Sequence, residues 1–205
     1  NTSFYTPASS PLQSTTTSSG LTIITSPNSR STSVTLTHSV GSASESGSQL
    51  GAAHVNQFLH FASSSSASTI AQRFHIENAG AHDFHHSDRT TSTVGISGGP
   101  EIAENAELLA RLAEGCSFES WDVRDALAFA EKEVDATESD PFAILSQSIF
   151  AAAYGGPHTE LGRTSHYPLY NGCDAQGVVS WRDNLTLKGS TVVGAGVKDH
   201  GKFVR

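Results

Sequence analysis

The residues that could carry chemistry lie in one apolar stretch, residues 50–61, which reads LGAAHVNQFLHF. His54 is followed three and four residues later by Gln57 and Phe58. A zinc-binding helix of the form H-x-x-E-H has a glutamate and a second histidine at these two positions. The two histidines share one helical face and bind one Zn²⁺, and the glutamate acts as general base. Here an amide replaces the base and a phenyl ring replaces the second ligand. The pattern therefore predicts a buried helix that keeps the position of a peptidase site without its chemistry.

Alternating and helical patterns around this stretch indicate which elements position it. Two β-branched runs, residues 21–25 and 33–40, predict a hairpin in which Val34, Leu36 and His38 share one face. The further elements that we expect are a helix at 68–77, strands at 81–87 and 90–97, helices at 100–116, 119–136 and 141–154, a long loop at 155–175 and a strand at 191–196. The helix at 141–154 is apolar on several faces, so we expect it to be buried. The order β-β-α-α-β-β-α-α-α-β predicts an α+β fold with an antiparallel-rich sheet covered by helices.

Length and charge limit the classes of function. A chain of 205 residues can form one well-buried core, and a net charge of −8 with no basic stripe argues against nucleic acid as a partner. No apolar run approaches the ~20 residues that span a bilayer. Two cysteines, Cys116 and Cys173, are too few for a disulfide framework. Residues 1–20 are rich in Ser and Thr, and we expect an extended arm there, followed by one domain over residues 21–205.

Several short segments, in order and at fitting distances, carry a resemblance to a known family. They are Val40–Glu45 (VGSASE), Leu50–His54 (LGAAH), Trp121–Val123 (WDV), Ala151–Tyr154 (AAAY) and Leu161–Arg163 (LGR). In these segments the chain resembles the N-terminal half-domain of the pitrilysin and mitochondrial processing peptidase family. Within that family it is most similar to the core proteins of mitochondrial complex III. The resemblance implies a metallopeptidase-like half-domain.

The resemblance also places a second part of the degenerate site. Peptidases of this family hold zinc with two histidines and a glutamate farther along the chain. Glu133 lies 75 residues after Phe58 and matches that distal position, with Glu131 as the alternative. The site remnants are then His54, Gln57, Phe58 and Glu133, of which His54 and Glu133 keep the family's residue type. This set predicts no catalytic residue, no bound metal and no hydrolysis.

What the resemblance implies for function is a structural role. We expect a non-catalytic core subunit of respiratory complex III, peripheral on the matrix side of the mitochondrial inner membrane. Its partners would be a homologous core or processing-peptidase-like subunit, the membrane subunits, and a separate chain that supplies the second half-domain. Residues 1–20 and 155–175 are the expected docking segments. The alternatives are a silent partner of a processing peptidase and an accessory subunit of another respiratory complex such as ATP synthase.

Two further groups of residues allow a functional and a plain interpretation. His82, His85 and His86 could form a relocated metal site with His54 and His60, but strand alternation separates His85 from the other two, which favours surface or interface histidines. Four carboxylates cluster near the end of the 119–136 helix, at Glu131, Glu133, Asp135 and Glu138. Such a cluster is usually a solvated face, although it could also bind a basic presequence.

Overall fold

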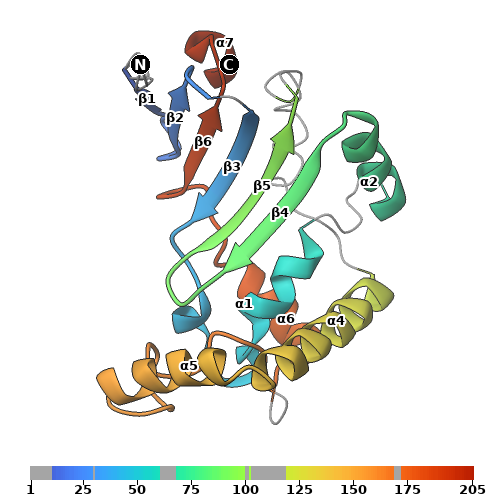
Figure 1. Cartoon of the computed structure of the whole chain (residues 1–205), viewed down its shortest axis with the longest axis vertical. Coiled ribbons are helices and arrows are strands. Elements are labelled where there is room, and N and C mark those ends of the chain that lie inside the picture. The colour runs from blue at the N-terminus through green and yellow to red at the C-terminus, as the bar shows by residue number, and fades with distance from the viewer. Residues whose placement is uncertain (1–10, 30, 61–67, 100–101, 103–118, 169–171) are drawn as a thin grey trace, which may run out of the picture.

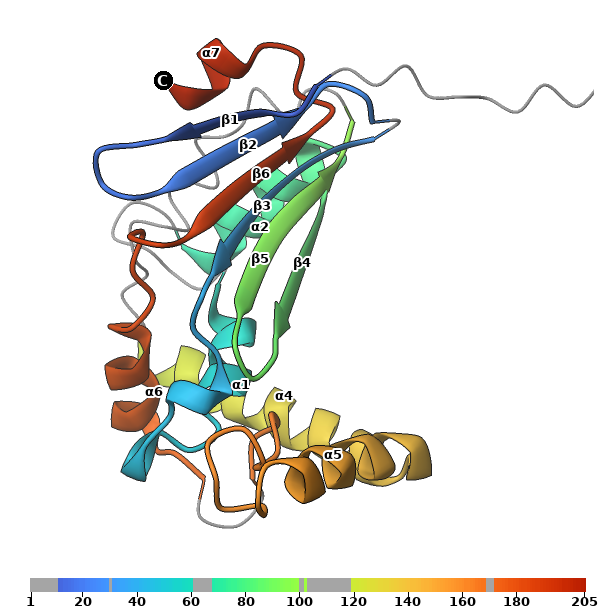
Figure 2. The same cartoon turned by 90° about the vertical axis from the view of Figure 1, so that its left-hand side faces the viewer.

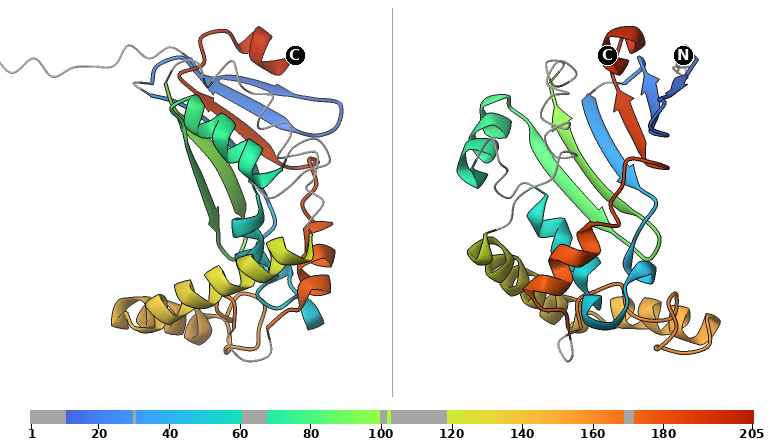
Figure 3. Two further views of the ribbon diagram at one scale, coloured as in Figure 1. Left: turned by 90° about the vertical axis from the view of Figure 1, so that its right-hand side faces the viewer. Right: turned by 180° about the vertical axis from the view of Figure 1, so that it is seen from behind.

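The computed structural model describes residues 11–29, 31–60, 68–99, 102, 119–168 and 172–205. The strands are β1 (Gln13–Thr16), β2 (Thr22–Ser26), β3 (Thr32–His38), β4 (His82–Ser87), β5 (Ser92–Gly98) and β6 (Thr191–Ala195). The helices are α1 (Ala52–Asn56), α2 (Thr69–Asn78), α4 (Ser120–Glu138), α5 (Pro141–Ala153), α6 (Ala175–Arg182) and α7 (His200–Val204). The strands form one sheet, α2 lies over one of its faces, and α1, α4, α5 and α6 gather at one end of it (Figures 1 and 3). The expected α+β class with an antiparallel-rich sheet is confirmed. The helix expected over residues 100–116 and Cys116 fall outside the described residues, apart from Ile102.

The strand order is β1-β2-β6-β3-β5-β4, and every neighbouring pair is antiparallel except β2 with β6. The hairpin predicted between residues 21–25 and 33–40 is therefore wrong. Strand β6, from the C-terminal part of the chain, inserts between β2 and β3 and pairs with both, so that Ile24 lies opposite Val193 and Thr35 also lies opposite Val193. Strand β2 forms its hairpin with β1 instead. Part of the expected arm is thus an edge strand, whereas residues 1–10 fall outside the described residues.

The predicted alternation of β3 is confirmed, because Val34, Leu36 and His38 are all buried while the residues between them are partly exposed. Apolar side chains from this face form one hydrophobic cluster with β5, the end of α2 and the start of β4. Its buried members are Val34, Leu36, Ile76, Ala81, Val94, Ile96 and Ile102. This cluster fixes the sheet on which the rest of the domain is built.

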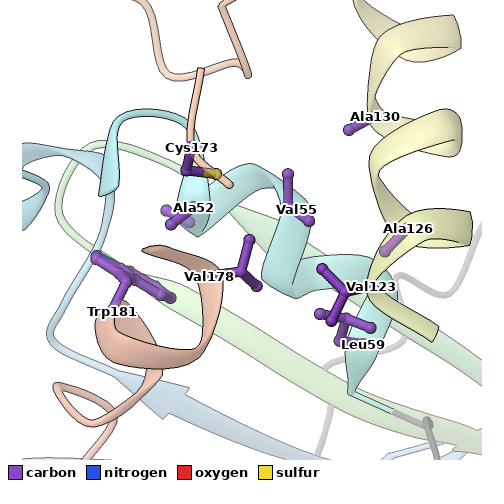
Figure 4. Packing of buried hydrophobic residues seen from close by; sticks show 10 residues of the cluster. Ala52, Val55, Leu59, Val123, Ala126, Ala130, Cys173, Val178 and Trp181 are labelled. Carbon is purple, nitrogen blue, oxygen red and sulfur yellow. The ribbon is translucent and has the colours of Figure 1, made fainter. Parts of the chain in front are cut away.

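A second cluster surrounds α1 and lies at the end of the sheet (Figure 4). Helix α4 contributes a stripe of small residues, α6 contributes Val178 and Trp181, and the segment before α6 contributes Cys173. The members are Ala52, Ala53, Val55, Leu59, Val123, Ala126, Ala130, Cys173, Val178 and Trp181. Because alanines face α1 from α4, the two helices can approach closely enough for polar side chains to bond across the contact.

The buried helix predicted over residues 50–61 is shorter than expected. Gly51 has φ +91°, in the left-handed region, so α1 begins at Ala52. After Asn56 the chain tightens into a 3₁₀ turn over Gln57–Leu59. Burial of this segment is as predicted, since His54, Asn56 and Gln57 are all enclosed.

Helix α4 confirms the helix predicted over residues 119–136, and it starts with reciprocal capping between Glu119 and Asp122. Helix α5 matches the predicted bounds, but its predicted burial is wrong. None of its residues, all of which the structure describes, is buried. Helices α6 and α7 occupy stretches to which the sequence analysis assigns no element. Among the described helices, none combines the length and apolarity that crossing a membrane requires.

Truncating Leu59 tests the second cluster, because its side chain is 2% exposed and fills the space between the 3₁₀ turn and α4. We expect Leu59→Ala to lower the free energy of unfolding by about 2–5 kcal/mol through lost burial and a residual cavity. The measurement is urea unfolding followed by circular dichroism. Leu12→Ala is the matched control, since Leu12 is 68% exposed. A loss for Leu59→Ala no larger than the control's would contradict this packing.

Candidate functional site

The four residues singled out from the sequence come together where α1 meets α4. His54 Nε2 lies 3.0 Å from Glu133 Oε2, and Gln57 Nε2 donates to the same oxygen at 3.0 Å. Of the two candidates for the distal position, Glu133 is the one whose carboxylate contacts His54 and Gln57. The His54 side chain is 3% exposed and that of Glu133 is 47% exposed, so the pair lies at the edge of the core.

Phe58 fills the space beside His54. Its ring centroid lies 5.7 Å from that of His54 and 5.5 Å from that of His85 on β4, both edge to face. It also stacks on Phe129 of α4 at 6.1 Å. The position that would carry a second nitrogen ligand is thus part of an aromatic cluster that joins α1, α4 and the sheet.

The sequence before α1 fixes its orientation. The Glu45 carboxylate accepts hydrogen bonds from the backbone N–H groups of Gly51 and Ala53, each at 2.8 Å. These are donors of the first turn that have no partner within the helix. Trp181 donates from Nε1 to Ser44 Oγ at 3.1 Å, which attaches α6 to the same turn. Glu45 thereby holds the N-terminal end of α1, the helix that carries His54.

A loop after α5 covers the site from the other side. The His166 ring lies edge to face with the His54 ring at 5.1 Å. Arg163 donates from Nη2 to the backbone oxygens of Glu45 at 2.7 Å and Ala43 at 3.3 Å. The sequence analysis missed His166, Arg163 and Glu45 as parts of the site, because each acts through the fold and not through a recognisable spacing.

Arg89, in the turn between β4 and β5, holds both α5 and this loop. It donates from Nε to the Leu161 oxygen at 2.9 Å and from Nη2 to the Arg163 oxygen at 3.2 Å. Its guanidinium also donates to Gln147 and lies 3.8 Å from the Phe150 ring centroid. One residue of the sheet therefore positions the helix and the loop that flank the site.

Burial keeps the histidines of this region uncharged at neutral pH. Desolvation lowers the pKa of His54, and the hydrogen bond and charge of Glu133 oppose that shift in part. Desolvation also lowers the pKa values of His85 and His166, and that of His60 to about 3. Burial raises the pKa of Glu45 to about 7, although its two backbone hydrogen bonds and the charge of Arg163 act against the rise.

The residues present do not fit a zinc ion. A peptidase site supplies three protein ligands and leaves a position for water, and of the three corresponding positions here only those of His54 and Glu133 carry a donor atom, since Phe58 has none. In the part of the chain that the structure describes, no three His, Cys, Asp or Glu side chains converge on a point that could hold a metal. The relocated histidine site does not assemble either: His85 faces Phe58, while His82 and His86 are exposed on β4.

The lowered pKa of His60 predicts a pH dependence of stability. The unfolded chain protonates histidine near pH 6.5, whereas folded His60 stays neutral down to about pH 3, so stability falls as the pH drops below about 6.5. Glu45 has the opposite sign: its folded pKa of about 7 exceeds the unfolded value, so its contribution is present at low pH and is lost as the pH rises through 7. We expect His60→Gln to reduce the loss of unfolding free energy between about pH 7 and pH 5 by up to about 2 kcal/mol.

The matched variant is Glu45→Gln. We expect its free energy of unfolding to fall more steeply on acidification, because the variant lacks the carboxyl group whose protonation opposes that fall. Urea unfolding at a series of pH values measures both slopes. Slopes that change in the same direction in the two variants would contradict the assignment.

Comparisons with known proteins agree with this fold. The model of the family described as insulinase (peptidase family M16) matches residues 21–167. Among solved structures, the chain is similar to a protease from Helicobacter pylori, with a TM-score of 0.82 and 17% sequence identity. The match covers 95% of this chain and 48% of that one, so the chain spans about half the length of that protease. No curated protein matches in sequence. With its sheet, its helices and the sequence of residues 21–167 all in agreement, this chain belongs to the insulinase family of peptidases, M16.

Proposed function

We propose that this chain is a catalytically silent member of its family that serves as a structural core subunit of mitochondrial complex III. It would lie peripherally on the matrix side of the inner membrane and support assembly. The observation that supports the absence of catalysis is the hydrogen bonding of the Glu133 carboxylate. Its carboxylate oxygen already accepts hydrogen bonds from His54 and Gln57.

Gln57 explains why water would not be activated at this position. A carboxamide has no useful basicity near neutral pH, so it cannot take a proton from water as a general base does. Its nitrogen instead donates to Glu133 at 3.0 Å, which a glutamate at position 57 could not do. The substitution turns a proton acceptor into a structural donor, and the site becomes a contact between two helices.

The outward face of α5 supports a role in assembly. No residue between Pro141 and Tyr154 is charged. Phe142, Leu145 and Ile149 are 81%, 56% and 58% exposed and follow one another at helical spacing. Figure 2 shows α5 extending from the end of the domain, away from the sheet. An exposed apolar face of this kind marks a contact with another protein.

Two grooves lie beside α5 and widen this surface. One, of about 410 Å³, is lined by Gln147, Ala151, Pro157 and Arg163 among others. The other, of about 350 Å³, is lined by Ala143, Ile144, Thr164 and Tyr167 among others. Both are bordered by residues 157–168, which lie within one of the expected docking segments. A partner that covered α5 would therefore also contact this loop.

The partner that we propose is a second half-domain of the same fold, carried by a homologous core or processing-peptidase-like subunit or by a separate chain. The match covers 48% of the H. pylori protease, so that protein contains about as much chain again, enough for a second unit of similar size. Exposed carboxylates lie just before α5, at Glu138 and Asp140, and in the loop after it, at Glu160, which favours a partner with basic residues at its edge. The membrane subunits of the complex would contact other parts of the assembly.

A specific observation favours one alternative, a silent partner of a mitochondrial processing peptidase. Glu131, Asp135 and Glu138 are exposed along α4, next to the Glu133 site. A positively charged peptide could bind such a face through charge attraction. In that case the chain would present substrate to an active homologue instead of supporting complex III.

Peptide hydrolysis tests the silent character. We expect the purified chain to cleave neither an unstructured peptide nor a basic presequence peptide above the background of its His54→Ala variant, with or without chelator, because base and ligand are both missing. The measurement is mass spectrometry of the peptides after prolonged incubation. Cleavage that chelator and His54→Ala both abolish would refute the proposal.

Native separation tests the assembly. After mild detergent extraction of mitochondria, we expect the tagged chain to migrate with the haem absorbance of cytochromes b and c1. F1 subunits in its place would assign it to ATP synthase, and a processing peptidase subunit would favour the alternative above. We expect Leu145→Glu on α5 to reduce co-migration about tenfold, because it buries a charge in the contact.

The matched control is Leu187→Glu, whose side chain is 37% exposed. It lies in the loop before β6, which is bonded to the β1–β2 turn through Gly189 N–H and the Gly20 oxygen. Thermal unfolding of both variants shows that the fold is intact. Equal loss of co-migration in the two variants would contradict the α5 contact.

A further inference from the structure

The backbone of the loop over residues 164–168 contacts His54 at the nitrogen that does not face Glu133. The N–H of Tyr167 points at His54 Nδ1, with 2.9 Å between the two nitrogens. A backbone amide has a hydrogen to donate and no lone pair to offer. His54 Nδ1 must therefore be the acceptor, and it carries no hydrogen.

This contact determines the tautomer of His54. A neutral imidazole has one N–H, so the hydrogen is at Nε2, which donates to Glu133 Oε2 at 3.0 Å. A charged imidazolium would have a hydrogen on Nδ1 facing the Tyr167 N–H, so the geometry excludes it as well. Donors and acceptors agree throughout the network: Tyr167 donates to His54, and His54 and Gln57 both donate to Glu133.

We propose that this backbone contact fixes His54 in a tautomer that cannot bind zinc, so that the site is closed to the metal independently of the two altered side chains. A histidine that binds through Nε2 needs its lone pair there and its hydrogen on Nδ1, which it usually donates to a carbonyl or a carboxylate. Here that hydrogen would face a second donor at 2.9 Å. Binding would require either an imidazolate or movement of the loop. The inference deepens the proposed function and rests on it.

Contacts on both sides hold the loop over residues 164–168 in place, so the Tyr167 N–H stays against His54. Arg163 is bonded to the backbone of Ala43 and Glu45, on the turn that leads into α1. Tyr167 itself packs on the start of α1: a Cβ built on Gly51 would lie 2.7 Å from its ring and 2.9 Å from its Cα. The loop and the helix are therefore in direct contact on both sides of the Tyr167 N–H, and moving the donor would disturb the anchoring of α1.

Restoring the side chains of the H-x-x-E-H pattern separates the effect of the Tyr167 N–H on zinc binding from the effect of the altered residues at positions 57 and 58. The double variant Gln57→Glu/Phe58→His has the ligands and base of the H-x-x-E-H pattern, and Tyr167→Pro added to it removes the backbone N–H. We expect zinc to bind the triple variant at least about tenfold more tightly than the double variant, measured by calorimetric titration with zinc alone. Tyr167→Phe in the double variant is the matched control, since it keeps the N–H. Equal zinc affinity of the folded double and triple variants would overturn the proposal.

Nitrogen-15 NMR of the imidazole tests the tautomer in the unmodified chain, which makes the test independent of whether the proline variant folds. We expect the chemical shift of a protonated nitrogen at His54 Nε2 and of an unprotonated one at Nδ1. The reverse pattern, or rapid exchange between the two, would overturn the proposal. Neither result depends on complex membership or on peptidase activity, so failure of this inference and failure of the proposed function are distinguishable.

Discussion

One oxygen of the Glu133 carboxylate accepts hydrogen bonds from both His54 and Gln57, and the geometry of the whole site depends on this shared acceptor. It requires α4 to lie close enough to α1 for short side chains to meet, which the alanines of α4 permit. It also requires both partners to be donors, and Gln57 and the Nε2 tautomer of His54 satisfy that requirement. A buried imidazole and a partly exposed carboxylate are thus stabilised without a metal ion between them. A polar network with matched donors and acceptors adds rigidity, whereas a half-satisfied one is costly.

Further hydrogen bonds connect α1 to the elements at the surface of the domain. Glu45 holds the beginning of the helix, Tyr167 contacts its middle, and Arg163 and Arg89 connect that loop to the sheet and to α5. Because these contacts form a closed chain, α5 and the grooves beside it are presented in a fixed orientation. A rigid surface loses little conformational entropy on binding. The residues around His54 and the exposed face of α5 are therefore connected by a continuous set of hydrogen bonds.

Local patterns in the sequence predicted the elements that depend on neighbouring residues. The alternation of β3 and the length of α4 follow from side-chain periodicity. Helical periodicity also distinguishes Glu133 from Glu131: Glu133 lies three residues after the buried Ala130 and shares its face, whereas Glu131 is rotated away. The β2–β3 hairpin was wrong because the strand that separates them comes from residues 191–195, beyond the reach of any local signal. The Tyr167 contact could not have been predicted from residue types, since it is made by a backbone N–H.

The wrong prediction for α5 has a different origin, and it bears on function. The absence of charged residues in a helix predicts that the helix is buried. It does not distinguish burial within the same domain from burial against another protein. In α5 only Ala143, Gln147 and Ala151 face the domain and are partly covered, while larger apolar side chains point outward. Exposed Phe and Ile side chains on a chain of net charge −8 are hard to explain by the stability of this domain alone. They are explained if the surface is selected for a contact, and the hydrogen bonds of Gln147 to Arg89 and Ser165 hold α5 in the orientation that presents it.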